Sequence, residues 1–218
     1  MNIVIIGHNE GEHVNSMLES LKEHLPYHKR IWVLDRCTDF TENFLNLHRE
    51  HIIKTDSTLE GRQTSYSRNL GLQACDPDQD VLFLDGDRYI VEGEFSPEEW
   101  KEDIALFKLQ SDNRDNIHDY QEVYGTVHNG FYSCGLFIKR KAIDMILNFQ
   151  GGYLFNEDIQ NSWGIEDTYL GDVCYHLGLS CDLHPNIQLH GLFPRSRLDG
   201  LHILKIRLDL RNNLNVKW

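Results

Sequence analysis

The chain has 218 residues, 40% of them hydrophobic and 25% charged, a composition typical of one well-buried globular domain. Its net charge of −13 argues against a general nucleic-acid-binding surface and is compatible with a site that recruits a metal cation. No apolar run approaches the roughly 20 residues that a membrane span requires, which argues against a transmembrane segment.

The cysteines and the N-terminal residues indicate the compartment. Five cysteines are present, an odd number without a CxxC pair, so we expect buried thiols rather than a disulfide framework. The sequence starts with an apolar run the length of one strand, at 3–6, and shows no secretory signal peptide. We therefore expect a cytoplasmic protein.

Strands and helices alternate in the first half of the sequence. The expected strands are 3–6, 31–34, 52–53 and 81–84. The expected helices are 14–25, one that carries Phe44, Leu45 and Leu47 after caps at 38–41, and 61–74. This order predicts an α/β fold with a doubly wound, mostly parallel sheet, right-handed crossovers and helices on both faces.

The strand at 81–84 runs directly into two carboxylates, Asp85 and Asp87, which are separated by Gly86. Because side chains alternate along a strand, both carboxylates are expected at the carboxyl edge of the sheet, where open α/β sheets bind ligands. Two carboxylates there suit a hard divalent cation such as Mg2+ or Mn2+ that itself holds phosphates. The alternative interpretation is a strand end followed by an Asp-Gly turn.

The second half of the sequence is less regular. Ser96 followed by Pro97 is typical of a helix start, and residues 105–109 predict a strand. Residues 112–121 are polar enough for a long loop. After that loop, 131–138 predicts a strand that leads into a helix.

Glu166 and Asp167 form a second acidic pair, which opens a predicted helix that ends at Gly178. Acidic residues in a first turn are also favoured by the helix dipole, which is the structural alternative to a functional role.

We expect residues 1–194 to form one domain and 195–218 a basic, helical extension. The extension holds six Lys or Arg against two Asp, and this local charge of +4 suits either a phosphate-rich partner, such as nucleic acid or an anionic membrane, or a solvated helix face.

Taken in order, five short motifs resemble those of the family 2 glycosyltransferases and their relatives with the GT-A fold. Residues 3–10 are similar to the family's first strand with its Tyr-Asn-Glu end, and 35–39 to its Asp-Asp-x-Ser-x-Asp run. Residues 68–71 are similar to its Arg-Asn-x-Gly helix, and 85–87 to its metal-binding Asp-x-Asp. Residues 163–167 are similar to its acceptor-side Glu-Asp with the Trp-Gly prefix of galactosyl- and N-acetylgalactosaminyltransferases. The match spans roughly residues 3–195 and departs at Arg36, where the family has a second Asp.

The resemblance implies a metal-dependent transferase that moves a sugar from a nucleotide-diphosphate donor, most often a UDP-sugar, to an acceptor hydroxyl. Direct displacement with one base would invert the anomeric centre, and Mn2+ or Mg2+ would be the cofactor. The implied metal ligands are Asp87, Asp85 and His190, with His184 as the alternative histidine and Asp85 shared between metal and ribose. On the acceptor side, Asp167 is the expected general base, and Glu166 and Trp163 would bind the sugar or the acceptor. Asp35 and Arg62 would contact the nucleobase and ribose, and Arg68, Arg195 and Arg197 would bind the donor.

The sequence leaves the acceptor and the reaction class open to alternatives. A saccharide or glycoconjugate acceptor is expected, and the basic extension favours as an alternative a hydroxymethylated base in DNA, as used by some bacteriophage enzymes. A nucleotidyltransferase would carry a glycine-rich, Lys-containing loop after the first strand, but residues 7–11 contain neither Lys nor Arg. A non-catalytic nucleotide-sugar-binding protein that retains the fold is the alternative of another class.

Overall fold

The computed structural model describes the chain except for residues 12, 56–62, 112–131, 160–164 and 192–218. The strands are β1 (Asn2–Gly7), β2 (Lys29–Leu34), β3 (His51–Lys54), β4 (Val81–Asp85), β5 (Arg88–Glu92), β6 (Ile104–Ser111), β7 (Leu136–Ile138) and β8 (Cys181–Gly191), and the helices are α1 (Val14–His24), α2 (Thr41–Leu47), α3 (Thr64–Gln73), α5 (Arg140–Gln150) and α6 (Ile165–His176). All the strands join one sheet in the order β3-β2-β1-β4-β7-β6-β8-β5.

The first half of the sheet is parallel, as the alternation of strands and helices predicts. β1 pairs with β2 on one side and with β4 on the other, and β3 extends the sheet beyond β2, all in parallel. The strand order therefore reverses at β1, since the chain moves outward to β2 and β3 and then returns to β4. Parallel sheets bind ligands in the crevice at the carboxyl ends of the strands on either side of such a reversal.

The second half of the sheet is mixed. β7 is antiparallel to both β4 and β6, whereas β8 is parallel to β6 and antiparallel to the edge strand β5. The predicted strands at 105–109 and 131–138 correspond to β6 and β7, while β5 and β8 were not predicted from the sequence. The helix start predicted at Ser96 is wrong, because Ser96 only accepts a turn hydrogen bond from the Glu99 N–H at 3.1 Å and the chain then passes on to β6.

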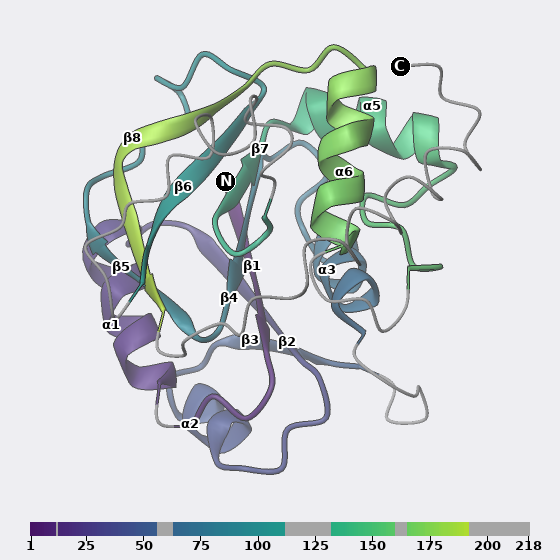
Figure 1. The fold of residues 1–218 in the computed structure, drawn as a ribbon. Helices are drawn as coiled ribbons and strands as arrows, with labels where there is room; N and C mark the ends of the chain where they lie inside the picture. The colour runs from purple at the N-terminus through teal and green to yellow at the C-terminus, as the bar shows by residue number, and fades with distance from the viewer. Residues whose placement is uncertain (12, 56–62, 112–131, 160–164, 192–218) are drawn as a thin grey trace.

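Alternating side chains of the buried strands build a hydrophobic core on each face of the sheet. Ile3 and Ile5 of β1 pack on the face covered by α1, and Val4 packs on the opposite face with α3, α5 and α6. Figure 1 shows these helices on opposite sides of the sheet. The architecture is thus a mixed, largely parallel α/β sheet with helices on both faces, which confirms the predicted fold class.

Two further expectations concern membranes and disulfides. Within the described ranges, no helix is long and apolar enough to cross a membrane. All five cysteines are free thiols; Cys134 and Cys174 are buried as expected, whereas Cys37, Cys75 and Cys181 are only partly buried. The loop predicted at 112–121 and the basic extension 195–218 lie outside the described residues, so the domain boundary at 194 stays a prediction.

Helix α3 lies directly against β1 because Gly71 has no side chain. A Cβ atom at Gly71 would stand 2.3 Å from Cγ1 of Val4, closer than any real carbon contact. The glycine of the Arg-Asn-x-Gly motif is therefore required by the packing of this helix on the sheet. It sets the height of the neighbouring residues Arg68 and Asn69 above β1 and β4.

We predict that Gly71→Ala destabilises the protein by about 1 to 3 kcal/mol, the usual range for an overpacked core. Urea unfolding followed by circular dichroism would measure the loss. The matched control is Gln73→Ala on the exposed side of the same helix, which should leave stability within about 0.5 kcal/mol of the parent. Equal stability of the two variants would contradict the close packing of α3 on β1.

Candidate functional site

The turn that joins β4 to β5 carries both carboxylates of the Asp-x-Asp motif. The Gly86 N–H donates a hydrogen bond to the Ile6 carbonyl oxygen at 2.7 Å, so the turn lies against the end of β1. A Cβ at Gly86 would come within 2.9 Å of Cγ of Glu10, which explains the small residue between the acids. The side chains of Asp85 and Asp87 are 22% and 27% exposed. Both therefore stand at the carboxyl edge of the sheet, as predicted.

Arg68 joins this turn to the second acidic pair. Its side chain is 4% exposed and its Nη2 lies 3.0 Å from Oδ1 of Asp85. Its Nη1 lies 3.4 Å from Oε1 of Glu166 and 3.8 Å from Oδ1 of Asp167. Burial lowers the pKa of Arg68, but the charges of Asp167, Asp85 and Glu166 more than offset this and raise it above its usual value. The sequence predicted these four residues, and the structure brings them together around one buried cation.

Glu166 and Asp167 differ in their surroundings. The Glu166 carboxylate is 5% exposed and accepts a hydrogen bond from Oγ1 of Thr64 at 3.1 Å. Burial, followed by the charge of Asp167, raises the pKa of Glu166 to about 7, although Arg68 opposes the shift. Asp167 is more accessible, at 13%, and its Oδ1 accepts no hydrogen bond from the described part of the chain. Asp167 is thus the more accessible member of the pair, although its Oδ1 is hidden from solvent on the side of Arg68.

Asn69 explains the second residue of the Arg-Asn-x-Gly motif. Its Oδ1 accepts hydrogen bonds from the N–H groups of Leu154 and Phe155 at 3.2 and 3.0 Å. Its Nδ2 donates to the Phe155 carbonyl oxygen and to Oε1 of Glu157, both at 2.7 Å. The segment held in this way places the Phe155 ring beneath the Arg68 guanidinium, 5.3 Å from the ring centroid. Asn69 therefore supports the position of Arg68.

Glu10 is a residue at this edge to which the sequence assigned no role. Its carboxylate accepts a hydrogen bond from the His8 N–H at 3.0 Å and packs against Gly86. Burial raises the pKa of Glu10 to about 7, the charges of Asp87 and Asp85 add to the rise, and the hydrogen bond from His8 opposes it. Its place at the end of β1 was visible in the sequence, but its burial beside the turn was not.

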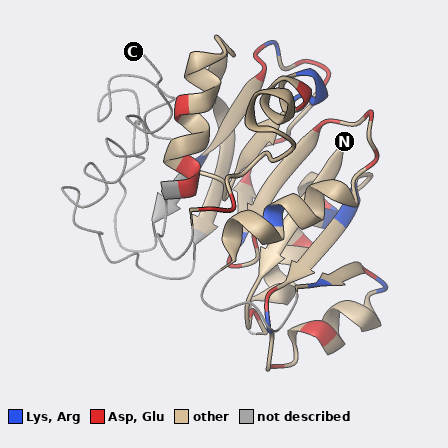
Figure 2. Cartoon of the chain, turned by 90° about the vertical axis from the view of Figure 1, so that its right-hand side faces the viewer, with Lys and Arg blue, Asp and Glu red and all other residues tan. Residues whose placement is uncertain are grey.

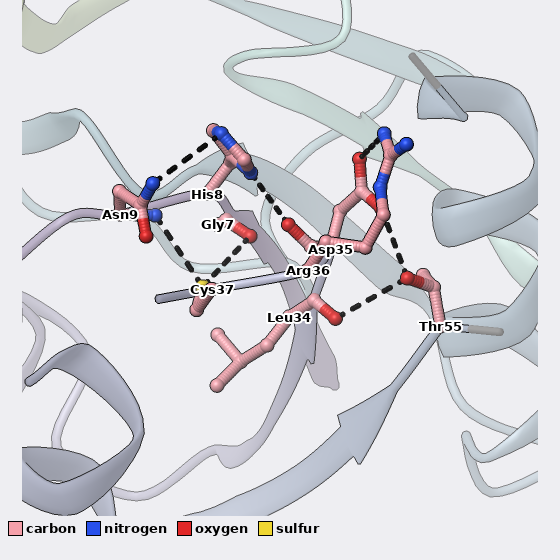
Figure 3. Close-up of polar contacts among 8 residues, drawn as sticks. All are labelled: Gly7, His8, Asn9, Leu34, Asp35, Arg36, Cys37 and Thr55. Carbon is pink, nitrogen blue, oxygen red and sulfur yellow. Dashed lines mark hydrogen bonds and ion pairs between the residues drawn. The ribbon is translucent and has the colours of Figure 1, made fainter. Parts of the chain in front are cut away.

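Asp35, at the end of β2, lies in the polar cluster of Figure 3. Its carboxylate accepts hydrogen bonds from Nε and Nη2 of Arg36 at 2.8 and 2.9 Å, and from Oγ1 of Thr55 at 2.9 Å. Burial favours the neutral acid, but these bonds outweigh it and lower the pKa of Asp35. Asp35 is therefore a pre-oriented carboxylate, and Arg36, which departs from the family pattern, is the residue that orients it.

The loop after β2 is fixed to the loop after β1. Nδ1 of His8 donates to the Asp35 carbonyl oxygen at 2.5 Å, which requires its proton on that nitrogen. Asn9, at a φ of 61°, accepts hydrogen bonds from the N–H groups of Thr38 and Asp39 at 2.7 and 3.3 Å. The Asp39 carboxylate in turn accepts from the Gly11 N–H at 2.8 Å. The two strand ends thus form one preorganised wall beside the acidic turn.

The two candidate histidines lie in different surroundings. His190 is on β8 opposite Tyr89, with ring centroids 5.2 Å apart, and the next pair in the ladder joins Gly191 to Arg88. β8 therefore runs beside the residue that follows Asp87, but Asp85, Asp87 and His190 form no metal-binding group in the described part of the chain, and the role of His190 stays a prediction. His184 is enclosed by aromatic rings, accepts a hydrogen bond from the Ile187 N–H at 3.2 Å, and has its pKa lowered mainly by burial.

Four of the predicted site residues, Arg62, Trp163, Arg195 and Arg197, lie outside the described part of the chain. Among the described residues, no group of three or more His, Cys, Asp or Glu is arranged to hold a metal ion. The acidic turn offers two carboxylate oxygen donors, which are the donor type that Mg2+ and Mn2+ prefer. The donor set thus fits a divalent cation that takes its other ligands from a phosphate-bearing substrate.

No known protein family matches the sequence, and no curated protein sequence does either. Solved structures share its fold. The S. aureus TarS 1-349 structure in complex with UDP has 18% sequence identity and a TM-score of 0.65, over 100% of this chain and 76% of that one. Against the longer TarS structure, this chain spans 46% of the length at 17% identity, with a TM-score of 0.65.

Two further solved structures extend the comparison. The mannosyltransferase PcManGT from Pyrobaculum calidifontis, in complex with GDP-Man and Mn2+, has 15% identity and a TM-score of 0.62, over 99% of this chain and 65% of that one. Glucosyl-3-phosphoglycerate synthase from Mycobacterium tuberculosis, with Mn2+, UDP-glucose and phosphoglyceric acid, has 16% identity and a TM-score of 0.58, over 100% and 81%. The chain therefore has the fold of the GT-A glycosyltransferases, which confirms the fold that the motifs implied.

The environment of Glu10 generates a prediction on pH dependence. A folded-state pKa of about 7, above the usual 4.5, means that the folded protein holds a proton that the unfolded chain releases as pH rises from about 4.5 to 7. The contribution of Glu10 to the free energy of unfolding is therefore most favourable below about pH 4.5 and falls as the pH rises to about 7. Glu10→Gln, which keeps the acceptor for the His8 N–H, should therefore gain about 1 to 2 kcal/mol over the parent between pH 5 and pH 8.

Urea unfolding of both proteins at pH 5 and pH 8, with EDTA present, would measure this difference. The contribution of Glu166 is common to both proteins and cancels. A difference that is the same at both pH values would show that Glu10 titrates normally.

Proposed function

We propose that this chain is a metal-dependent, inverting glycosyltransferase that moves a sugar from a nucleotide-diphosphate sugar to an acceptor hydroxyl. The observation that carries the proposal is the buried Arg68, which links the Asp85 side of the site to Glu166 and Asp167 within 3.0 to 3.8 Å. A donor-binding edge and a candidate base are thereby held in one network. The fold supports the assignment, since structures with this fold were solved with UDP, GDP-Man and UDP-glucose.

The donor would bind along the carboxyl edge of β1, β2 and β4. Asp85 and Asp87 would hold the cation, Mn2+ or Mg2+. His190 would become a third ligand only after a rearrangement, because it forms no metal-binding group with Asp85 and Asp87 among the described residues. When bound, the cation stabilises the negative charge of the departing diphosphate. Asp35 and Arg62 would contact the nucleobase and ribose, and Arg195 and Arg197 would bind the diphosphate.

Asp167 would act as the general base on the acceptor side. Its carboxylate takes the proton of the acceptor hydroxyl, whose oxygen forms the new bond to the anomeric carbon while the bond to the diphosphate breaks. A single displacement of this kind inverts the anomeric centre. Glu166, at the first turn of α6, would bind a sugar hydroxyl, and Trp163 would stack on the apolar face of a sugar. Arg68 would act as a positioning residue for both acidic pairs.

The acceptor is proposed to be a saccharide or glycoconjugate. The basic residues that favoured DNA as an alternative lie in 195–218, and in the view of Figure 2 the charges of the described residues are interspersed rather than gathered in a basic stripe. Five free thiols support a reaction in the cytoplasm.

The first experiment tests donor binding. Calorimetry with UDP-, GDP-, CDP- and TDP-sugars, each with and without Mn2+, should find one nucleotide whose affinity increases when Mn2+ is added. Asp87→Ala should remove that increase, because it deletes an expected metal ligand. Asp76→Ala, which removes an exposed carboxylate paired with Lys29, is the matched control and should bind like the parent.

Either of two results would argue against this donor site. No response to any nucleotide would sink the proposed function, and an Asp87→Ala protein with the parent's Mn2+ dependence would exclude the acidic turn as the metal site. Binding without transfer to any acceptor would favour a non-catalytic binding protein.

The second experiment tests the base. Asp167→Asn should bind the donor with the parent's affinity and lower transfer by about 10²- to 10⁴-fold, the usual contribution of a general base. Asp158→Asn, an exposed change in the preceding loop, is the control. Transfer is measured with a panel of saccharides and with hydroxymethylated DNA, and NMR of the product reports inversion. Near-normal turnover of Asp167→Asn would rule Asp167 out, and transfer to the DNA alone would replace the saccharide assignment.

A further inference from the structure

Arg88 directly follows the acidic turn and was assigned no role from the sequence. It is the first residue of β5 and pairs with Gly191 at the end of β8. Its side chain is only 5% exposed. Two residues further on, Ile90 is buried in the core beneath α1 at 2% exposure, so this face of the edge strand is turned toward the protein interior.

The buried guanidinium of Arg88 faces Asp87. Its Nε lies 3.5 Å from Oδ1 of Asp87, and Nε makes no hydrogen bond to any residue in the described part of the chain. Oδ1 of Asp87 is itself hidden from solvent, although the Asp87 side chain is 27% exposed. The exposure of Asp87 therefore falls on its other atoms, away from Arg88. One oxygen of the carboxylate thus faces the protein side.

The burial of Arg88 beside the acidic turn needs a physical explanation. Removing a guanidinium from water costs several kcal/mol, and apolar side chains of similar size often replace buried ion pairs without loss of stability. Arg30 shows what a structural pair looks like in this protein, since its Nε and Nη2 donate to both oxygens of Glu50 at 2.9 and 2.8 Å. The looser contact between Arg88 and Asp87 is a charge interaction that orients the carboxylate without occupying both of its oxygens.

Each of the two carboxylates of the turn faces a buried arginine. Asp85 faces Arg68, which is 4% exposed, and Asp87 faces Arg88, which is 5% exposed. Each acid therefore has its own buried cation, supplied by α3 in one case and by β5 in the other. The two arginines approach the turn from different elements, so the direction of each carboxylate is fixed independently.

We infer that Arg88 is a positioning residue for Asp87. It holds Oδ1 on the protein side and leaves the second carboxylate oxygen directed to the divalent cation that accompanies the donor diphosphate. This inference rests on the proposed function. Groups that orient a ligating side chain typically contribute about 10- to 100-fold to metal affinity, although they never touch the metal.

The test measures Mn2+ binding rather than activity. Free Mn2+ is followed by electron paramagnetic resonance while the full-length protein is titrated in the presence of UDP or GDP, whichever the parent binds. Arg88→Met, which keeps the volume and removes the charge, should weaken Mn2+ binding by about 10- to 100-fold. Arg88→Lys should restore part of the affinity, because it keeps the positive charge beside Asp87. The melting temperature of each variant reports folding.

Three comparisons separate positioning from a merely structural role. Arg30→Met deletes a partly buried arginine pair outside the proposed site and should lower the melting temperature without changing Mn2+ affinity. Nucleotide affinity without Mn2+ should be the same in Arg88→Met and in the parent. In the Asp87→Ala background, Arg88→Met should have no further effect on nucleotide binding in the presence of Mn2+, because its effect passes through the Asp87 carboxylate.

The possible failures are distinguishable. A parent that binds no Mn2+ with either nucleotide would overturn the proposed function and this inference with it. A parent that binds Mn2+ and an Arg88→Met variant that binds it equally well would overturn the inference alone. Tighter Mn2+ binding by Arg88→Met would also overturn the inference alone, since it would show that Arg88 competes with the cation for Asp87. An effect that persists in the Asp87→Ala background would show a purely structural role.

Discussion

The buried charge of Arg68 is the interaction on which the rest of the site depends. Carboxylates that converge on one edge of a sheet repel one another and resist burial. Four of the described carboxylates, those of Asp85, Asp87, Glu166 and Asp167, face the two buried arginines Arg68 and Arg88, and a fifth, that of Glu10, lies beside the turn. Where no arginine lies close, the proton compensates instead, and the pKa of Glu10 rises to about 7. The site therefore retains excess negative charge, which a divalent cation can neutralise.

The position of Arg68 is in turn a result of packing. Helix α3 meets β1 at Gly71, where no side chain fits, and this contact brings Arg68 level with the carboxyl ends of the strands. Asn69, the next residue, ties α3 to the segment around Phe155, and the Phe155 ring supports the guanidinium from below. A short motif in one helix thus combines close packing, a hydrogen-bonded clamp and a charge.

Sequence reasoning succeeded where structure is determined locally. Strands such as β1 and β4 are continuous apolar runs buried on both faces, so their order and the carboxylates at their ends were predictable. β8 was missed because Pro185 interrupts it and its register with β6 shifts between Phe107 and Lys108. The surroundings of Glu10 and Arg88 were missed for a related reason. They arise from contacts between segments far apart in sequence, and no local pattern encodes the burial of a charged side chain.

The charge balance of the site also bears on how a donor would bind under the proposed function. Asp85 and Asp87 already face arginines, and the described residues offer no third ligand group arranged for a metal ion. A cation that bound alone would have only these two carboxylates, which also interact with the arginines, as protein ligands. It would have to keep water molecules as most of its other ligands. A nucleotide diphosphate supplies oxygens that complete this coordination, and the cation compensates the charge that diphosphate would otherwise bring to an acidic edge. The arrangement therefore favours a cation and a diphosphate that bind together, with the arginines preventing the carboxylates from moving apart before they arrive.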